Sequence, residues 1–166
     1  MGIEVSAGSG LACPDQPMRT PELSTTVRRS LEKAARRAAN AAYAPYSRFR
    51  VGAAVLAKSG RIYSACNVEN ASYGLCICAE RAAIAAAVSA GERAVRAVAV
   101  YTPTPLPKSP CGACRQVISE FGPGALVISV CRSKKRLEAE LSELLPRSFG
   151  PEDLSRRPLR AVKSRG

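Results

Sequence analysis

The chain has 166 residues, a formal net charge of +12 and no histidine. This length suits one domain with a sizeable core, so a metal ion is not needed merely to hold the chain together. Apolar residues make up 46% of the sequence, but they include only three Phe and no Trp. A core of aromatic clusters is therefore excluded, and an α/β fold of closely packed helices and sheet is favoured.

The first half of the chain predicts an extension, a helix and a hairpin. Residues 1–22 contain Gly, Ser and Pro without periodicity, which indicates a flexible N-terminal extension before a domain at 23–155. Ser24 can cap a helix whose apolar residues recur every three or four positions as far as Ala42. The β-prone runs FRVGAAVLA and RIYSACNV then flank Lys58-Ser59-Gly60, the composition of a tight turn.

The second half alternates helices and strands. After the loop ENASYGLCI, a helix is expected to begin near Cys78 and to end at Gly91. The strand VRAVAVY, the proline-rich loop TPTPLPKSP, a helix over Cys111–Phe121 and the strand ALVISV follow in that order. The segment KKRLEAELSELL has helix propensity. Residues 156–166 are expected to form a basic C-terminal tail outside the domain.

The positive charge gathers in the tail, in a short run and along the first helix. These side chains are Arg156, Arg157, Arg160, Lys163 and Arg165, then Arg132, Lys134, Lys135 and Arg136, and finally Arg28, Arg29, Lys33, Arg36 and Arg37. Clustered basic residues can bind nucleic acid, but no aromatic residues interleave with these charges. Solvated surfaces are the ordinary explanation, so we expect no specific binding of nucleic acid.

The seven cysteines indicate a cytoplasmic protein with reduced thiols. Their number is odd, and the N-terminal sequence does not have the pattern of a secretory signal. No apolar run reaches the length of a membrane span, so neither a membrane partner nor an anchor is expected. The start MGIEVS matches a myristoylation pattern at Gly2, but such short patterns often match by chance.

Three cysteines are candidate zinc ligands. Cys111 and Cys114 form a Cys-x-x-Cys pair, which can be half of a zinc site or a redox dithiol. The preceding proline-rich loop favours zinc, because a redox pair normally follows a strand closely. Cys78 is the most convincing third ligand, and three thiolates leave one position open for water. Cys76 as a fourth ligand would instead close the site and make it structural.

The helices around these cysteines favour an open, reactive site. Cys78 and the Cys111–Cys114 pair are expected at helix starts, where unpaired N–H groups stabilise thiolates. Glu80 lies two residues from a ligand, where its carboxylate can exchange protons with a zinc-activated water. A glutamate favoured simply by the helix dipole is the common alternative. Arg81 is the candidate for offsetting the excess negative charge of three thiolates.

The motifs Cys-Ala-Glu and Pro-Cys-Gly-Ala-Cys together match the zinc-deaminase signature, with cysteine in place of the first histidine. The segments FRVGAAVLAKSGRIYSACNVENASYGLCICAER, SPCGACRQVISEFGP and ELLPRSFGPEDL resemble the small homotetrameric cytidine deaminases of pyrimidine salvage, over about residues 24–154. The resemblance implies a three-layer α/β/α fold with a mixed five-stranded sheet. It also implies a last strand near Arg136–Leu141, against the local helix propensity.

The resemblance further implies how the site works. Zinc is held by Cys78, Cys111 and Cys114, and Glu80 moves protons during hydrolytic deamination of cytidine or 2′-deoxycytidine to uridine or 2′-deoxyuridine and ammonia. The implied substrate contacts are Phe49 with the pyrimidine, Asn67 and Glu69 with the ribose hydroxyls, the Ala79 backbone with the base, Tyr73 near a subunit contact, and Phe149 in a neighbouring subunit's site. Without the resemblance, Phe49 and Phe149 would be core residues and Asn67 a turn residue.

Other functions remain open at this point. The enzyme could act on a modified cytosine nucleoside or a nucleoside antibiotic, because the termini and the segment CRSKKRLEAEL depart from the family pattern. A structural zinc or nucleic-acid-binding module is the alternative that is not an enzyme. The preference between cytidine and deoxycytidine and the role of the two termini cannot be read from the residues.

Overall fold

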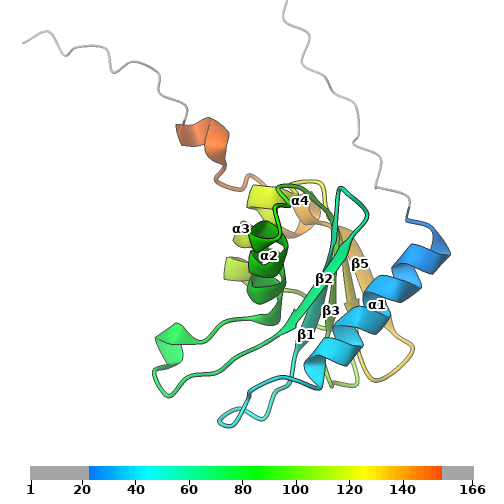
Figure 1. The fold of residues 1–166 in the computed structure, drawn as a ribbon, viewed down its shortest axis with the longest axis vertical. Coiled ribbons are helices and arrows are strands. Elements are labelled where there is room, and N and C mark those ends of the chain that lie inside the picture. Colours follow the sequence, from blue (N-terminus) through cyan, green and yellow to red (C-terminus); the bar gives the residue numbers. More distant parts are fainter. Residues whose placement is uncertain (1–22, 155–166) are drawn as a thin grey trace, which may run out of the picture.

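The computed structural model describes residues 23–154. A five-stranded sheet is covered by helix α1 (Thr25–Ala39) on one face and by α2 (Ala79–Ser89) and α3 (Gly112–Phe121) on the other (Figure 1). The predicted three-layer α/β/α architecture with a mixed sheet is confirmed. The predicted N-terminal extension and basic C-terminal tail lie outside the described residues.

The sheet has the strand order β2-β1-β3-β4-β5. Its strands are β1 (Gly52–Ala57), β2 (Ile62–Cys66), β3 (Val95–Tyr101), β4 (Leu126–Val130) and β5 (Arg136–Glu140). β1 pairs antiparallel with both β2 and β3, β3 pairs parallel with β4, and β4 pairs antiparallel with β5. Every residue of β1 and β4 is buried, because both faces of these inner strands are covered.

Helix α1 begins and ends through local hydrogen bonds. The Ser24 hydroxyl accepts from the Val27 N–H across 3.3 Å, which is the predicted N-cap. The helix stops at Ala39, three residues before the predicted end at Ala42, because the next N–H groups bond to carbonyls only three residues back. Its buried face packs on the sheet through Leu31, Ala35 and Ala39.

Gly52 lets α1 approach β1 at backbone distance. A Cβ atom at this position would lie 2.0 Å from the carbonyl oxygen of Ala35 and 2.5 Å from the nitrogen of Ala39. Backbone atoms cannot move aside as a flexible side chain can, so no larger residue fits here. The glycine therefore fixes the spacing between the helix and the sheet.

Strand β5 forms where local propensity favours a helix. Residues Arg136–Glu140 pair with β4 over five positions, from Val130 opposite Arg136 to Leu126 opposite Glu140. Ladder hydrogen bonds to a fully buried neighbour outweigh a preference of a few tenths of a kcal/mol per residue. The strand implied by the family resemblance is therefore present.

The basic face of α1 is only partly solvated, contrary to the prediction. Arg28 forms an ion pair with Glu138 of β5, and Arg136 of β5 forms one with Glu32 across 3.3 Å. The guanidinium of Arg36 lies 4.7 Å from the centre of the Tyr101 ring. Part of the positive charge thus holds α1 against the sheet.

Helices α2 and α3 begin next to each other on the same face of the sheet. Cys78 is the N-cap residue of α2, and Cys111 is the N-cap residue of α3. Gly91, with a φ of +92°, follows the end of α2, as predicted. The short elements η1 (Tyr73–Leu75), α4 (Leu141–Leu144) and η2 (Pro151–Leu154) complete the fold. Within residues 23–154, no helix has the length and apolarity needed to cross a membrane.

Candidate active site

The two helix starts bring three cysteine sulfurs together. The Sγ atoms of Cys78, Cys111 and Cys114 all lie within 4.8 Å of one another, and no other such group of potential metal ligands occurs among residues 23–154. Cys76 is not part of the cluster. Its sulfur accepts from the Asn70 N–H across 3.3 Å and donates to the Asn70 carbonyl across 3.7 Å. The arrangement is therefore a three-thiol site.

Hydrogen bonds and a guanidinium stabilise negative charge in this cluster. The thiol of Cys114 and then Arg81 lower the pKa of Cys78 to about 5. The same coupling to Cys78, together with burial, raises the pKa of Cys114. Cys78 is therefore the first of the pair to become a thiolate. Arg81 donates to the Cys78 sulfur across 3.7 Å and to the Cys76 carbonyl across 2.9 Å.

Glu80 is a buried carboxyl group beside the cysteines. Only 5% of the residue is exposed, and its side chain lines the same cavity as Cys78. Burial is the main cause that raises its pKa, and the nearby charge of Cys78 acts in the same direction. A carboxyl group in this position can hold a proton, or release it, without contact with bulk water.

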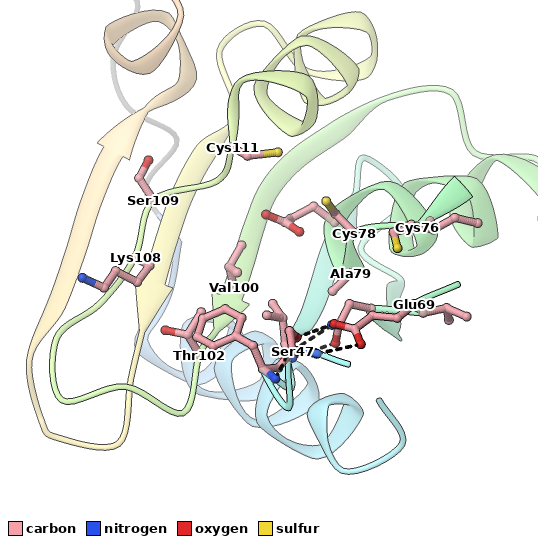
Figure 2. A pocket seen from close by; sticks show the side chains of 16 residues that line it. Ser47, Glu69, Cys76, Cys78, Ala79, Val100, Thr102, Lys108, Ser109 and Cys111 are labelled. Atoms are coloured by element: carbon pink, nitrogen blue, oxygen red, sulfur yellow. Dashed lines mark hydrogen bonds between the residues drawn. The ribbon is translucent and has the colours of Figure 1, made fainter. Parts of the chain in front are cut away.

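The cavity next to the cluster has a volume of about 290 Å³. It is bounded by the start of α2, by the loop before β1, by the loop after β2 and by the proline-rich loop before α3 (Figure 2). Seven predicted site residues line it, namely Phe49, Asn67, Glu69, Cys78, Ala79, Glu80 and Cys111.

Asn67 holds the loop that carries Phe49. Its side-chain oxygen accepts from the Val51 N–H across 2.8 Å, and its side-chain nitrogen donates to the Phe49 carbonyl across 2.9 Å. Asn67 is half-buried, and its amide joins its own loop after β2 to the segment that carries Phe49. Among residues 23–154, the second N–H of the Asn67 amide has no acceptor, so it is available to a ligand.

Glu69 is fixed by the segment before Phe49. One carboxylate oxygen accepts from the N–H groups of Tyr46 and Ser47, across 2.9 and 3.2 Å, and the other accepts from the Ser47 hydroxyl. The Ser47 hydroxyl is the main cause that lowers the pKa of Glu69. Glu69 is therefore a preorganised carboxylate at the side of the cavity away from Cys111 (Figure 2).

Tyr73 and Phe149 do not line the cavity of the single chain. Tyr73 is 73% exposed and packs against Tyr46, with ring centres 5.9 Å apart and the ring planes tilted by 58°. Phe149 is 58% exposed, so it is not a plug in its own core. Helix α3 holds its backbone, because the Gln116 amide donates to the Phe149 carbonyl across 2.8 Å.

Sequence reasoning missed several residues of the cavity wall. Ser47, Thr102, Lys108 and Ser109 all contribute to it. Lys108 and Ser109 stand directly before the predicted ligand segment that starts at Cys111, and this adjacency is the only signal that could have indicated them. Thr102 begins the same proline-rich loop and Ser47 lies in the loop before β1, but nothing in either sequence marks these two side chains, and only the folded chain brings them to the cavity.

Comparison with known proteins finds a matching family model and several similar proteins. The family model described as "Cytidine and deoxycytidylate deaminase zinc-binding region" matches residues 25–130. The cytidine deaminase of Sporosarcina psychrophila is 49% identical over 121 residues, which cover 72% of this chain and 89% of that protein. The cytidine deaminase of Halalkalibacterium halodurans is 47% identical over 129 residues, covering 77% of this chain and 98% of that protein.

Solved structures agree with these sequence matches. The crystal structure of cytidine deaminase from Burkholderia pseudomallei superposes with a TM-score of 0.70 and 46% identity, covering 73% of this chain and 98% of that chain. The corresponding values for cytidine deaminase from Mycobacterium tuberculosis are 0.63 and 41%, with 74% of this chain and 97% of that chain covered.

Proposed function

This chain belongs to the cytidine and deoxycytidylate deaminase family, and from this premise we propose how it acts. It is a zinc-dependent hydrolase that converts cytidine and 2′-deoxycytidine to uridine and 2′-deoxyuridine with release of ammonia. One observation carries the proposal: the buried Glu80 carboxyl group lines the same cavity as Cys78 and Cys111. A carboxyl group beside an open metal site is what hydrolysis of an amidine requires.

The cysteine cluster fits a zinc ion. Zinc binds thiolates at about 2.3 Å and prefers tetrahedral sites, so sulfurs around one ion lie roughly 3.8 Å apart. The three sulfurs, all within 4.8 Å of one another, need only a small contraction to reach this arrangement. Cys78, Cys111 and Cys114 would hold the ion, which would supply Lewis-acid activation of a water molecule when bound.

Glu80 carries the protons of the reaction. We place its carboxylate to accept a proton from the attacking water and to deliver it to N3 of the pyrimidine. Glu80 next accepts the remaining proton from the new C4 hydroxyl and passes it to the amino group, so that the C4–N bond breaks, a C4 carbonyl forms and ammonia leaves. Burial of Glu80 supports this role, because the proton stays with the substrate and is not lost to bulk water.

Asn67 and Glu69 have the capacity to bind a ribose hydroxyl. A hydroxyl needs one donor to its oxygen and one acceptor for its proton. Asn67 retains a free N–H after its bonds to Phe49 and Val51, and Glu69 retains a free acceptor position. We assign this pair to the ribose, Phe49 to the face of the pyrimidine, and the Ala79 backbone to the polar edge of the base.

We further propose a homotetramer with shared active sites. Two large exposed aromatic side chains support it, because Tyr73 and Phe149 leave most of their surface uncovered in one chain. Phe149 would complete the site of a neighbouring subunit, and Tyr73 would lie at the contact. Residues 23–155 would form the deaminase domain of each subunit. A role in pyrimidine salvage and a cytoplasmic location stay predictions.

One assay tests the function. Purified protein is incubated in parallel with cytidine, 2′-deoxycytidine, cytosine, cytidine monophosphate and a cytosine-containing oligonucleotide, while ammonia and base absorbance are recorded. We expect release of one ammonia per nucleoside consumed, with cytidine and deoxycytidine as the preferred substrates. Turnover of the oligonucleotide alone, or of none of these compounds by zinc-loaded protein, would refute the proposal.

A further inference from the structure

The Ser47 hydroxyl joins two parts of the substrate cavity that come from different segments of the chain. It donates a hydrogen bond to Glu69, and its oxygen accepts from the Phe49 N–H across 3.0 Å. Ser47 itself lines the cavity next to both residues. Figure 2 shows the dashed bonds between Ser47 and Glu69 at the wall of the cavity. One hydroxyl group thus connects the carboxylate on the loop after β2 with the loop before β1.

The acceptor positions of Glu69 show what this connection does. An ionised carboxylate has about four acceptor positions, two on each oxygen. The oxygen Oε2 already accepts from the N–H groups of Tyr46 and Ser47. The oxygen Oε1 accepts only from the Ser47 hydroxyl within the described part of the chain. The position left for a ligand is therefore on Oε1, the same oxygen that Ser47 holds.

We propose that Ser47 is a positioning residue for recognition of the sugar hydroxyls. Its hydroxyl fixes the orientation of the Glu69 carboxylate. The free acceptor position on Oε1 is therefore already oriented before the ligand binds. It fixes the Phe49 backbone at the same time, which sets the distance between the sugar-binding carboxylate and the aromatic ring. The inference rests on the proposed function, because it takes Glu69 to be the acceptor for a ribose hydroxyl.

The N–H groups of Tyr46 and Ser47 in the same loop also bond to Glu69, but on Oε2, and no other side chain among residues 23–154 bonds to both Glu69 and the Phe49 backbone. Asn67 bonds to the Phe49 carbonyl and to the Val51 N–H, but neither bond reaches Glu69. Removal of the Ser47 hydroxyl would leave Glu69 held on Oε2 alone, and the carboxylate could then rotate about its last bond. Binding would have to restore the order that the hydroxyl now provides.

The test compares Ser47→Ala with Ser47→Thr, which keeps the hydroxyl, on two substrates. Cytidine has both sugar hydroxyls, whereas 2′,3′-dideoxycytidine has neither. For Ser47→Ala we expect the KM for cytidine to rise about 10- to 100-fold, as for loss of a hydrogen bond to a charged group, with kcat little changed. The kcat/KM for the dideoxy compound should fall far less, because that compound loses only the support of the Phe49 backbone, and Ser47→Thr should restore the KM for cytidine.

A matched control is available in the same chain. Ser59 also donates to a glutamate, Glu92, across 2.6 Å, but it lies in the hairpin turn outside the cavity. Ser59→Ala removes the same kind of bond and should leave both KM values unchanged. Equal losses on the two substrates in Ser47→Ala, or an unchanged KM for cytidine, would overturn the proposal.

Binding of the products separates this inference from the proposed function. Titration calorimetry with uridine and 2′,3′-dideoxyuridine needs no turnover, so it tests Ser47 even if the zinc-loaded protein proves inactive on cytidine. Ser47→Ala should weaken the binding of uridine far more than the binding of 2′,3′-dideoxyuridine. If wild-type protein binds neither product, or binds both equally, the inference is wrong. If Ser47→Ala does not fold, Ser47→Cys with its weak donor replaces it and should show the same selective loss.

Discussion

The Arg81 guanidinium lies 3.7 Å from the sulfur of Cys78, and the same Nη2 atom donates to the Cys76 carbonyl. Three thiolates around a divalent zinc ion sum to a charge of −1, which weakens the ability of the ion to activate water. Arg81 offsets this charge from a fixed position. The rate of the chemical step should therefore depend on a residue that contacts neither the substrate nor the metal.

We expect Arg81→Gln to lower kcat by about 10- to 100-fold, since one hydrogen bond to a charged group contributes about 1.5–3 kcal/mol. Zinc content, measured by atomic emission, should stay close to that of the wild type. Arg93→Gln is the control, because Arg93 bonds only to carbonyls at the end of α2. An unchanged kcat in the Arg81 variant would show that its charge plays no part.

Glu80→Gln should retain zinc and fold but lose activity. General acid–base groups contribute roughly 10²- to 10⁴-fold, and Glu80 acts at more than one proton transfer, so we expect a loss at the upper end of this range. Glu120→Gln on the exposed side of α3 is the control. Activity close to that of the wild type in Glu80→Gln would exclude the assigned mechanism.

Single substitutions should distinguish the predicted metal ligands from the neighbouring Cys76. Cys111→Ser should lose zinc and activity together, because two thiolates with a weaker oxygen ligand bind zinc poorly. Cys76→Ser should keep both, since its sulfur bonds to the Asn70 backbone. Zinc per chain and kcat are measured on the same samples. Loss of zinc from the Cys76 variant would point to a four-thiolate site instead.

The shared active site can be tested by complementation. Phe149→Ala should stay folded, zinc-loaded and tetrameric by light scattering, but it should bind cytidine worse. When it is mixed with Glu80→Gln chains under conditions that exchange subunits, some sites combine an intact Glu80 with a neighbour's intact Phe149. Activity should then exceed that of either parent. Verified exchange without recovery would mean that Phe149 serves its own chain.

The stability of the hairpin should depend on pH through Glu92. Its Oε1 atom accepts from the Ser59 hydroxyl and from Arg61, and these bonds lower the pKa of Glu92 below its ordinary value of 4.5. The contribution is therefore present above about pH 4.5 and is lost as pH falls through the lower folded value. Urea unfolding should show Glu92→Gln less stable than the wild type at pH 7, with a difference that shrinks below pH 4.5. If the difference in unfolding free energy between the two proteins did not change with pH, ionisation of Glu92 would not be its cause.

The metal cluster and the order of the elements could be predicted because they depend on local patterns. Cys78 and Cys111 occur where a loop turns into an amphipathic helix, and such helix starts are readable from sequence. The contacts that hold the elements together could not be predicted. Arg28 and Glu138 are 110 positions apart, and nothing in either segment indicates that the other will lie beside it.

The substrate cavity shows the same limit. The residues assigned to the nucleoside were found through the family resemblance, because no periodicity marks Asn67 or Glu69. Even so, the resemblance did not reveal that both side chains hold the Tyr46–Val51 segment. A hydrogen bond from a loop hydroxyl such as Ser47 depends on the folded path of two loops, and sequence patterns do not contain that path.

The strand β5, whose residues favour a helix, forms one outer edge of the sheet. Its sequence RLEAE places charged side chains at every second position, and Lys134 and Lys135 precede it. An unpaired strand edge is a template on which other chains can add, and charged side chains along it oppose such growth. The same residues that make β5 a poor strand by propensity thus make it a poor seed for aggregation, so the chain can leave this edge open during synthesis and folding.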